Sequence, residues 1–341
     1  MMSLWELVKK RECSTVAVCG MAKNTGKTVT LNYLVKSAGK EGMDLGLTSI
    51  GRDGEMWDVL SYKRKPPIYV KPGMLLATAE KTLPAATAKL KVLQLTELET
   101  PLGRVAIARA ETAGRVELAG PSRVAQLLEV INALKAFGIQ LVLVDGTFDR
   151  QSFAAPRVTE GFILATGGIL SESLQEVVKI TRHCVDRLLL PKTSDEIIEY
   201  YRQGYVVVLS VKGHKAYPGS IMRGQKNEFW KSLNESISHI IFGGALLTPT
   251  LIDVMDSEID IKGMRVVVRD ATCIFVDKKV IDEFTERGGR IEVLEPMDLL
   301  AVTVNPTSPE GRDFESKVFY DAMSQSLKDV PVFDLVQGYG P

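Results

Sequence analysis

The residues with the clearest chemical role form a short run near the beginning of the sequence. Gly20 is separated by five residues from Gly26, and Lys27 and Thr28 follow directly. The run lies between an apolar, strand-like segment at 15–19 and a segment with helical periodicity. In such a loop, backbone N–H groups and the positive end of the helix dipole attract phosphate. Lys27 is placed to reach the β- and γ-phosphates of a nucleotide, and the Thr28 hydroxyl to bind Mg²⁺.

The predicted nucleotide contacts are confined to this loop and the first turn of the helix. They are Gly20, Met21, Ala22, Lys23, Asn24, Thr25, Gly26, Lys27, Thr28 and Val29. The spacing differs by one residue from that of the common phosphate loop, because Met21 occupies the position of the usual first glycine. An ordinary glycine turn before a helix is the alternative interpretation. Lys23 lies one position away from the additional lysine of dimerising P-loop ATPases, so we interpret it as a solvated loop residue.

Two acidic residues are candidates for Mg²⁺ binding and catalysis. The apolar run 141–144 ends in Asp145, which is the pattern of a Walker B strand, whose carboxylate holds Mg²⁺ directly or through water. Asp53 lies in the run 48–55 and would bind Mg²⁺ or orient an attacking water or substrate, although a polar turn explains this run equally well. Both runs follow strand-like segments, and parallel strands end at one edge of a sheet, where ligands bind. The predicted catalytic residues are Lys27, Asp53 and Asp145, and the predicted metal ligands are Thr28, Asp53 and Asp145.

Further polar residues follow other strand-like segments, and each has a purely structural alternative. They are Glu55, Lys71, Asp149 with Arg150, and the runs 166–168 and 305–309. The acidic and basic side chains would contact substrate or the γ-phosphate, whereas a surface ion pair is the alternative for Asp149 and Arg150. The glycine-rich and proline-rich runs would border a ligand, although close packing and turn chemistry also account for them.

The elements that must position these residues alternate along the whole chain. Strands are predicted at 15–19, 45–49, 104–108, 115–118, 141–144, 161–165 and 187–190. Helices are predicted to begin near Lys27, Met74, Ser122 and Ser173. This alternation is typical of a mostly parallel sheet with helices on both faces. The predicted fold class is therefore α/β, of the P-loop NTPase type.

A second alternation of strands and helices begins after Pro191. Strands are predicted near Val206, His239, Arg265, Arg290, Leu300 and Val332, with helices near Asn227, Pro249, Lys278 and Phe314. The predicted domains are a nucleotide-binding domain at 1–204 and a smaller C-terminal α/β domain at 205–341. The second domain has no obvious catalytic constellation, which favours a role in binding a partner.

Composition limits the class of protein. The chain has 341 residues with 42 Lys and Arg against 42 Asp and Glu, a formal net charge of +0. This balance provides no overall field for nucleic acid or an anionic membrane. No apolar run reaches the roughly 18 residues of a membrane helix. Four cysteines without CxxC spacing indicate reduced thiols. We expect a cytoplasmic protein that binds neither nucleic acid nor membrane.

The long loop spacing, Gly-x5-Gly-Lys-Thr, resembles that of dethiobiotin synthetase and the cobyrinate amidating synthetases. A wider resemblance is to the smaller reactivase subunit (KamB-type) of the adenosylcobalamin-dependent lysine 5,6-aminomutase system. The matching runs are GMAKNTGKT at 20–28, GLTSIGRDGE at 46–55, VELAGPS at 116–122, VDGTFDRQSF at 144–153 and LATGG at 164–168, with NPTSP at 305–309 as a thinner extension. They span most of the predicted first domain.

The resemblance implies a role in repairing a B12-dependent enzyme. ATP binding or hydrolysis, with Mg²⁺, would open the aminomutase and release its damaged cobalamin. The expected partners are that aminomutase and a larger ATPase subunit resembling the MutS mismatch-repair protein, and self-association as a homodimer is left open. ATP is favoured over GTP because the sequence lacks an Asn/Thr-Lys-x-Asp motif. We expect a weak ATPase stimulated by its partner.

A second hypothesis belongs to a different functional class. An ATP-dependent ligase or kinase of the dethiobiotin synthetase type would use Asp53, Glu55 and Lys71 to handle a small substrate. Its ATP turnover would depend on a small carboxylate or amine, whereas turnover by a reactivase would rise with a protein partner.

Overall fold

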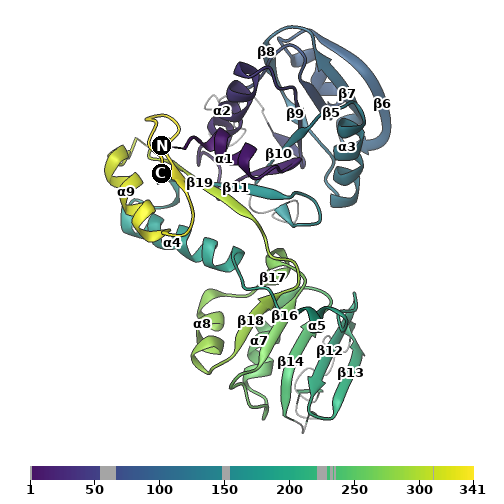
Figure 1. Ribbon diagram of the computed structural model, residues 1–341, viewed down its shortest axis with the longest axis vertical. Helices are drawn as coiled ribbons and strands as arrows, with labels where there is room; N and C mark the ends of the chain where they lie inside the picture. The colour runs from purple at the N-terminus through teal and green to yellow at the C-terminus, as the bar shows by residue number, and fades with distance from the viewer. Residues whose placement is uncertain are drawn as a thin grey trace. The chain divides into compact units, whose positions relative to one another are not determined.

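The computed structural model describes residues 2–53, 67–147, 154–220, 229–230, 233, 236–309 and 311–341, with only the backbone at 52, 53 and 147. The chain forms two compact units (Figure 1). Unit 1 comprises Met1–Arg182 and Asp298–Pro341, and unit 2 comprises His183–Met297. This division differs from the predicted one at 204 and 205, because the C-terminal segment returns to the sheet of unit 1.

Unit 1 is built on a nine-stranded sheet with the order β20-β19-β11-β1-β10-β2-β5-β7-β6. From β20 to β5 neighbouring strands run parallel, and β7 and β6 then pair antiparallel at one end. The strands are β1 (Thr15–Gly20), β2 (Leu45–Ser49), β5 (Leu75–Ala79), β6 (Leu90–Thr100), β7 (Gly103–Ala110), β10 (Leu141–Thr147), β11 (Gly161–Gly167), β19 (Leu299–Asn305) and β20 (Val332–Phe333). The predicted α/β class with a large, mostly parallel sheet is confirmed.

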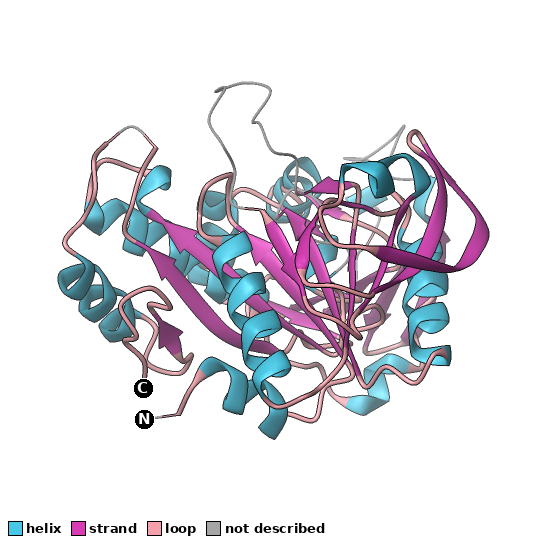
Figure 2. Cartoon of the chain, turned by 90° about the horizontal axis from the view of Figure 1, so that it is seen from above, coloured by secondary structure: helices cyan, strands magenta, loops and turns pink. Residues whose placement is uncertain are grey.

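Helices lie on both faces of this sheet (Figure 2). They are α1 (Leu4–Lys10), α2 (Lys27–Lys40), α3 (Val124–Ala136), α4 (Leu174–Leu188) and α9 (Ser316–Ser326). One apolar core joins α1 and α2 to alternate residues of the strands, including Val16, Val18 and Leu143. On the opposite face α3 packs so closely that a Cβ at Gly46 would lie 3.4 Å from Leu134 Cδ1. Because both faces of the sheet are buried, the central strands consist of unbroken apolar runs.

Two short ladders accompany the large sheet. β3 (Arg52–Asp53) pairs with β9 (Leu118–Ala119), and β4 (Ile68–Val70) pairs with β8 (Gly114–Val116). The strand predicted at 115–118 is therefore divided between two ladders. The backbone of Asp53 lies opposite that of Leu118, just beyond the end of β2.

Unit 2 contains a five-stranded sheet with the order β13-β12-β14-β16-β18. Its strands are β12 (Tyr205–Ser210), β13 (Gly213–Pro218), β14 (Ile237–Phe242), β16 (Arg265–Val268) and β18 (Arg290–Val293). The other elements are α5 (Asp195–Ile198), α7 (Thr248–Met255), α8 (Lys278–Glu286) and the paired β15 (Leu246–Leu247) and β17 (Ile274–Phe275). The second alternation of strands and helices therefore does form a smaller α/β unit, but it ends before residue 298.

Two of the predicted elements are wrong, and in both cases tertiary packing explains the difference. The helix predicted near Met74 is the strand β5, whose five residues are all buried between β2 and β7. The strand predicted at 187–190 overlaps the end of helix α4, where Val177, Val185 and Leu188 are buried at helical spacing. Asn227, near which a helix was expected, lies outside the described residues. Among the described residues, no helix combines the length and apolar character needed to cross a membrane.

Candidate functional site

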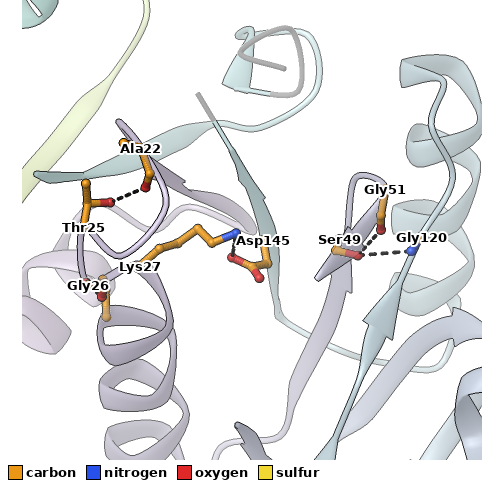
Figure 3. Close-up of polar contacts among 9 residues, drawn as sticks. Ala22, Thr25, Gly26, Lys27, Ser49, Gly51, Gly120 and Asp145 are labelled. Carbon is orange, nitrogen blue, oxygen red and sulfur yellow. Dashed lines mark hydrogen bonds and ion pairs between the residues drawn. The ribbon is translucent and has the colours of Figure 1, made fainter. Parts of the chain in front are cut away.

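The glycine loop with Lys27 and the end of β10 with Asp145 meet at the carboxyl edge of the unit 1 sheet (Figure 3). β10 lies between β1 and β2, and all three run parallel. Their register aligns Asp145 with Val18 on one side and with Ser49 on the other. The glycine loop, Asp145 and the turn after β2 therefore lie next to one another. This is the edge at which parallel α/β sheets bind ligands.

The loop between β1 and α2 is held by its own hydrogen bonds. The buried Thr25 hydroxyl donates to the Ala22 carbonyl at 2.9 Å, and the Met21 N–H donates to the Ala165 carbonyl of β11 at 2.9 Å. A Cβ at position 20 would lie 2.8 Å from the Thr25 hydroxyl oxygen, so the close turn requires Gly20. These contacts keep the loop compact.

The helix begins where the loop has to turn sharply. Gly26 is the N-cap of α2 and has φ = +91°, a conformation that glycine adopts without a steric penalty. No side chain caps this end of α2. Lys23 and Asn24 are exposed, while Thr28 and Val29 are half-buried in the first turn of α2.

Lys27 and Asp145 form the central contact of the site. The ammonium nitrogen of Lys27 lies 3.1 Å from Oδ1 of Asp145, and the two side chains are 12% and 1% exposed. Both charges are thus largely removed from solvent. A buried charge is stable only beside an opposite charge, so each depends on the other. Figure 3 shows Lys27 extending from the helix across to the strand that carries Asp145. Two residues chosen from separate sequence patterns are in direct contact.

The turn after β2 lies on the side of Asp145 opposite β1 and contacts its backbone. The Ile50 N–H donates to the Asp145 carbonyl at 3.0 Å. The Ser49 hydroxyl donates to the Gly51 carbonyl at 2.7 Å and accepts from the Gly120 N–H at 3.1 Å. This network joins the end of β2 to the segment that leads into α3. It was not expected from the sequence, because Ser49 and Gly120 are 71 residues apart.

We expect Gly120→Ala to destabilise unit 1, since the new Cβ would lie 1.7 Å from the Ser49 carbonyl oxygen. Backbone must move to relieve such an overlap, at a cost of about 1–3 kcal/mol or more. Thermal unfolding followed by circular dichroism should show a lower transition midpoint. Gly244→Ala is the matched control, because a Cβ there meets no atom within 4 Å. Equal midpoints for the two variants would show that the close approach of Gly120 to Ser49 does not constrain the backbone.

Asn305 is a site residue that the sequence analysis assigned to the other domain. Its side-chain N–H donates to the Asn24 carbonyl of the loop at 2.9 Å, and a Cβ at Gly26 would lie 3.0 Å from Asn305 Cβ. Two residues earlier, the Thr303 hydroxyl is 2.8 Å from that of Thr30 in α2. The end of β19 therefore supports the loop from the side opposite Asp145. The run 305–309 does follow a strand, but only the topology places that strand in the same sheet as the loop.

We expect Asn305→Ala to loosen the loop because the bond to the Asn24 carbonyl is lost. A hydrogen bond of this kind contributes about 0.5–1.5 kcal/mol. Hydrogen exchange of the amides at 24–26 should accelerate by roughly 2- to 12-fold. Thr307→Val is the control, since it removes only the 2.9 Å contact to Asn305 Oδ1. If both variants exchange like the wild type, Asn305 has no role in holding the loop.

The remaining sequence candidates fall into three groups. Gly167 supports the close-packing interpretation of 166–168, because a Cβ there would lie 2.7 Å from the Asn305 carbonyl oxygen and 3.4 Å from Thr25 Cα. Lys71 lies away from the loop, because its ammonium contacts the Lys36 carbonyl in the C-terminal half of α2 at 3.4 Å. Glu55, Asp149, Arg150 and the side chain of Asp53 lie outside the described residues.

Within the described part of the chain, no group of three or more His, Cys, Asp or Glu side chains is arranged to hold a metal ion. The chain matches no protein-family model, no curated protein and no solved structure.

Proposed function

We propose that this chain binds MgATP through the loop 20–28, as a nucleotide-binding protein of the P-loop type. The contact between Lys27 and Asp145 carries the proposal, because it joins the last part of the glycine loop to the acidic end of a neighbouring parallel strand at 3.1 Å. In P-loop proteins a lysine in this position contacts the phosphates, and an acidic residue in this position holds the Mg²⁺. The central place of β1, between β10 and β11, also supports this fold type.

The residues present fit MgATP by charge. Lys27 and Asp145 neutralise each other in a largely buried pair. When MgATP binds, its phosphates would give Lys27 an anionic partner and its Mg²⁺ would give Asp145 a cationic one, so neither buried charge would lose its partner. Mg²⁺ characteristically takes one or two protein ligands together with phosphate oxygens. Thr28 and Asp145 would be those ligands, and Asp53 is a third candidate.

The phosphates would lie against the N-terminus of α2. The backbone N–H groups of its first turn point toward this end, and no side chain occupies the N-cap bond. Lys27 would hold the β- and γ-phosphates, while Asn305 and Thr25 would keep the loop in shape. Hydrolysis would require a positioned water, and the slow ATPase that we propose would be accelerated by a partner that completes the site.

For the biological role we propose a reactivating factor that releases damaged cobalamin from a B12-dependent aminomutase, together with a MutS-like ATPase subunit. The resemblance of the five sequence runs supports this role. ATP would have to favour one of two conformations that bind the mutase differently. A coupling of about 1–3 kcal/mol would change the affinity for the mutase by about 5- to 150-fold.

The second candidate function is an ATP-dependent ligase or kinase of the dethiobiotin synthetase type. The position of the turn at 49–51 supports this candidate. This turn lies beside Asp145 and leads directly to Asp53, where a small substrate would approach the phosphates. Lys71 contributes nothing to that alternative, because it contacts the C-terminal half of α2. Dependence of ATP turnover on a small carboxylate or amine would distinguish this function.

The first experiment measures nucleotide binding by isothermal titration calorimetry with ATP and with GTP, each with and without Mg²⁺. We expect ATP to bind more tightly with Mg²⁺ than without it, and more tightly than GTP. Lys40→Ala serves as a control for the loss of a lysine, since Lys40 is exposed at the C-terminal end of α2. Absence of ATP binding in a folded protein would refute the proposal.

The proposed biological role is tested by a reactivation assay. Cobalamin-inactivated lysine 5,6-aminomutase is mixed with this protein, the larger ATPase subunit, MgATP and fresh adenosylcobalamin. Recovery of mutase activity that depends on this chain supports the reactivating role. Failure to recover activity, with a mutase and a larger subunit known to be competent, would favour the small-molecule enzyme.

A further inference from the structure

The two faces of the unit 2 sheet are covered very differently. On one face, α7 and α8 contribute to a large apolar core, which includes Leu251 of α7 and Phe284 of α8. On the opposite face (the α5 face), the buried cluster formed by described residues is small, and it consists of Ile197, Val207, Ile241, Val267 and Leu294. In this part of the chain, α5 is the helix that packs there, and it has only four residues. The described helices therefore leave much of the α5 face uncovered.

A row of mostly polar residues crosses the sheet on the α5 face. The strand registers align His214, Leu209, His239, Arg265 and Arg290, one from each of the five strands. Side chains alternate between the two faces of a strand, and Leu209 packs against the cluster of the α5 face. At one end, the ring of His214 stacks on that of Tyr200, with the centroids 4.9 Å apart. The row ends at the other side in Arg290, which is exposed.

Arg265 is held in this row by two neighbours. Its Nε atom lies 3.1 Å from Oε1 of Glu292, whose side chain is 11% exposed, and its Nη1 atom donates to Nε2 of His239 at 3.5 Å. Burial, and then the positive charge of Arg265, lower the pKa of His239, so a neutral ring accepts this bond. The Arg265 side chain nevertheless remains 43% exposed. A guanidinium that is fixed and partly exposed is preorganised to bind an anion.

Arg290 lies beside Arg265 and adds a second positive charge. The register of the parallel strands places the two residues opposite each other, and neighbouring strands are about 4.8 Å apart. Arg290 forms no ion pair with any described residue, and the adjacent carboxylate of Glu292 is paired with Arg265. Like charges opposite each other destabilise a sheet. An added carboxylate would therefore relieve the repulsion between the two arginines.

We propose that the part of this row from His239 to Arg290 is a docking surface for an acidic segment of a partner protein, whose carboxylates bind Arg265 and Arg290. Charge complementarity selects an acidic partner, because two guanidinium groups face a single carboxylate of this chain. Arg265 gives the segment a fixed anchor, and Arg290 gives it an unpaired one. The half-buried Leu209, next in the row, adds an apolar contact.

The number of charges and their arrangement favour a polypeptide over other anions. The row crosses five neighbouring strands, a span of about 19 Å, whereas small molecules usually bind in concave sites. Nucleic-acid binding without sequence preference relies on about 6–10 phosphate contacts, and an anionic membrane on about 4–8 clustered Lys or Arg residues. Two arginines in a chain with a formal net charge of +0 fall short of both.

This proposal does not depend on nucleotide binding, because the row lies in unit 2 and the loop 20–28 lies in unit 1. It goes beyond the proposed nucleotide function by assigning a surface and a chemistry to the binding of a protein partner. A chain that fails to bind ATP can still bind an acidic peptide. The two failures are distinguishable because the peptide is titrated in the absence of nucleotide.

Fluorescence anisotropy of a rhodamine-labelled hexaglutamate peptide, titrated with the full chain at low salt, tests the surface. We expect saturable binding that weakens as salt is added. Arg290→Glu should weaken it by roughly fivefold or more, because an attraction becomes a repulsion. Arg290→Lys keeps the charge and should retain most of the affinity. Arg265 is left unchanged, because its loss would remove the cation beside the largely buried Glu292.

Lys279→Glu is the matched control for a change in net charge. Lys279 is exposed on α8, which packs on the opposite face of the same sheet, so its reversal should leave the affinity unchanged. Circular dichroism of each variant ensures that a change in affinity is not caused by unfolding.

Each contrary outcome overturns the proposal. If hexaglutamate does not bind, the row is no docking surface for acidic segments. Equal weakening by Arg290→Glu and Lys279→Glu would mean that only the net charge matters. Displacement of the peptide by free glutamate at the same carboxylate concentration would indicate a site for small anions. Tighter binding of a thymidine oligonucleotide of equal charge would indicate a nucleic-acid surface.

Discussion

Lys27→Ala should reduce the affinity for MgATP by about 10- to 150-fold, because a hydrogen bond to a charged group contributes about 1.5–3 kcal/mol. The lysine is the residue that would hold the β- and γ-phosphates. Isothermal titration calorimetry measures the change directly. Lys40→Ala, which removes an exposed lysine from the opposite end of α2, should leave the affinity close to that of the wild type. Unchanged affinity in Lys27→Ala would rule out this loop as the phosphate site.

The same substitution should also affect stability, and this effect has to be separated from binding. Without Lys27, the carboxylate of Asp145, only 1% exposed, loses the ammonium group that lies 3.1 Å from it. Breaking such a pair from one side costs about 3–5 kcal/mol. The double variant Lys27→Ala/Asp145→Asn removes both charges, so it should recover most of the stability while still binding MgATP weakly. That combination would attribute the lost affinity to the missing ammonium group rather than to unfolding.

Asp145→Asn should change the dependence of binding on the metal. The amide keeps the size of the carboxylate but is a much poorer ligand for Mg²⁺, and Lys27 no longer has its anionic partner at 3.1 Å. We expect affinity for MgATP to fall by about tenfold or more, since one charge-assisted contact of about 1.5–3 kcal/mol is lost. Metal-free ATP should bind at least as tightly as to the wild type. Titrations with and without Mg²⁺ measure the difference.

A matched carboxylate variant is available at the opposite edge of the same sheet. Glu160 precedes β11 and accepts a hydrogen bond from the Ser14 N–H at 2.6 Å, next to the beginning of β1. Glu160→Gln should leave both titrations unchanged. Equal losses with and without Mg²⁺ in Asp145→Asn would remove Asp145 from its role as a metal ligand, even if Lys27 proved essential.

Local sequence patterns were sufficient to predict the glycine loop, its position after β1, the start of α2 and the acidic end of β10. Each of these features depends on neighbouring residues: an apolar run forms a buried strand, Gly26 allows the turn, and the helix begins at Lys27. The placement of Lys27 and Asp145 at one edge of the sheet was also predicted, because parallel strands end at the same edge. Their direct contact depends on β1 and β10 being neighbours, which only the structure shows. The roles of these residues remain predictions that the experiments above address.

Only the tertiary structure decided which distant segments complete the site. Asn305 contacts the loop across 281 residues of chain, and a strand that ends in Asn looks the same in sequence whichever sheet it joins. The contact of Ser49 with Gly120 likewise joins segments far apart in the chain, so the sequence did not predict it. The helix expected near Met74 is a strand, because burial between two strands outweighs the local helical preference. The domain boundary was also not predicted, because the return of residues 298–341 to the first sheet depends on strand pairing. Local propensity and periodicity determine where strands and helices form, but the choice of partners depends on packing between segments that are far apart in the chain.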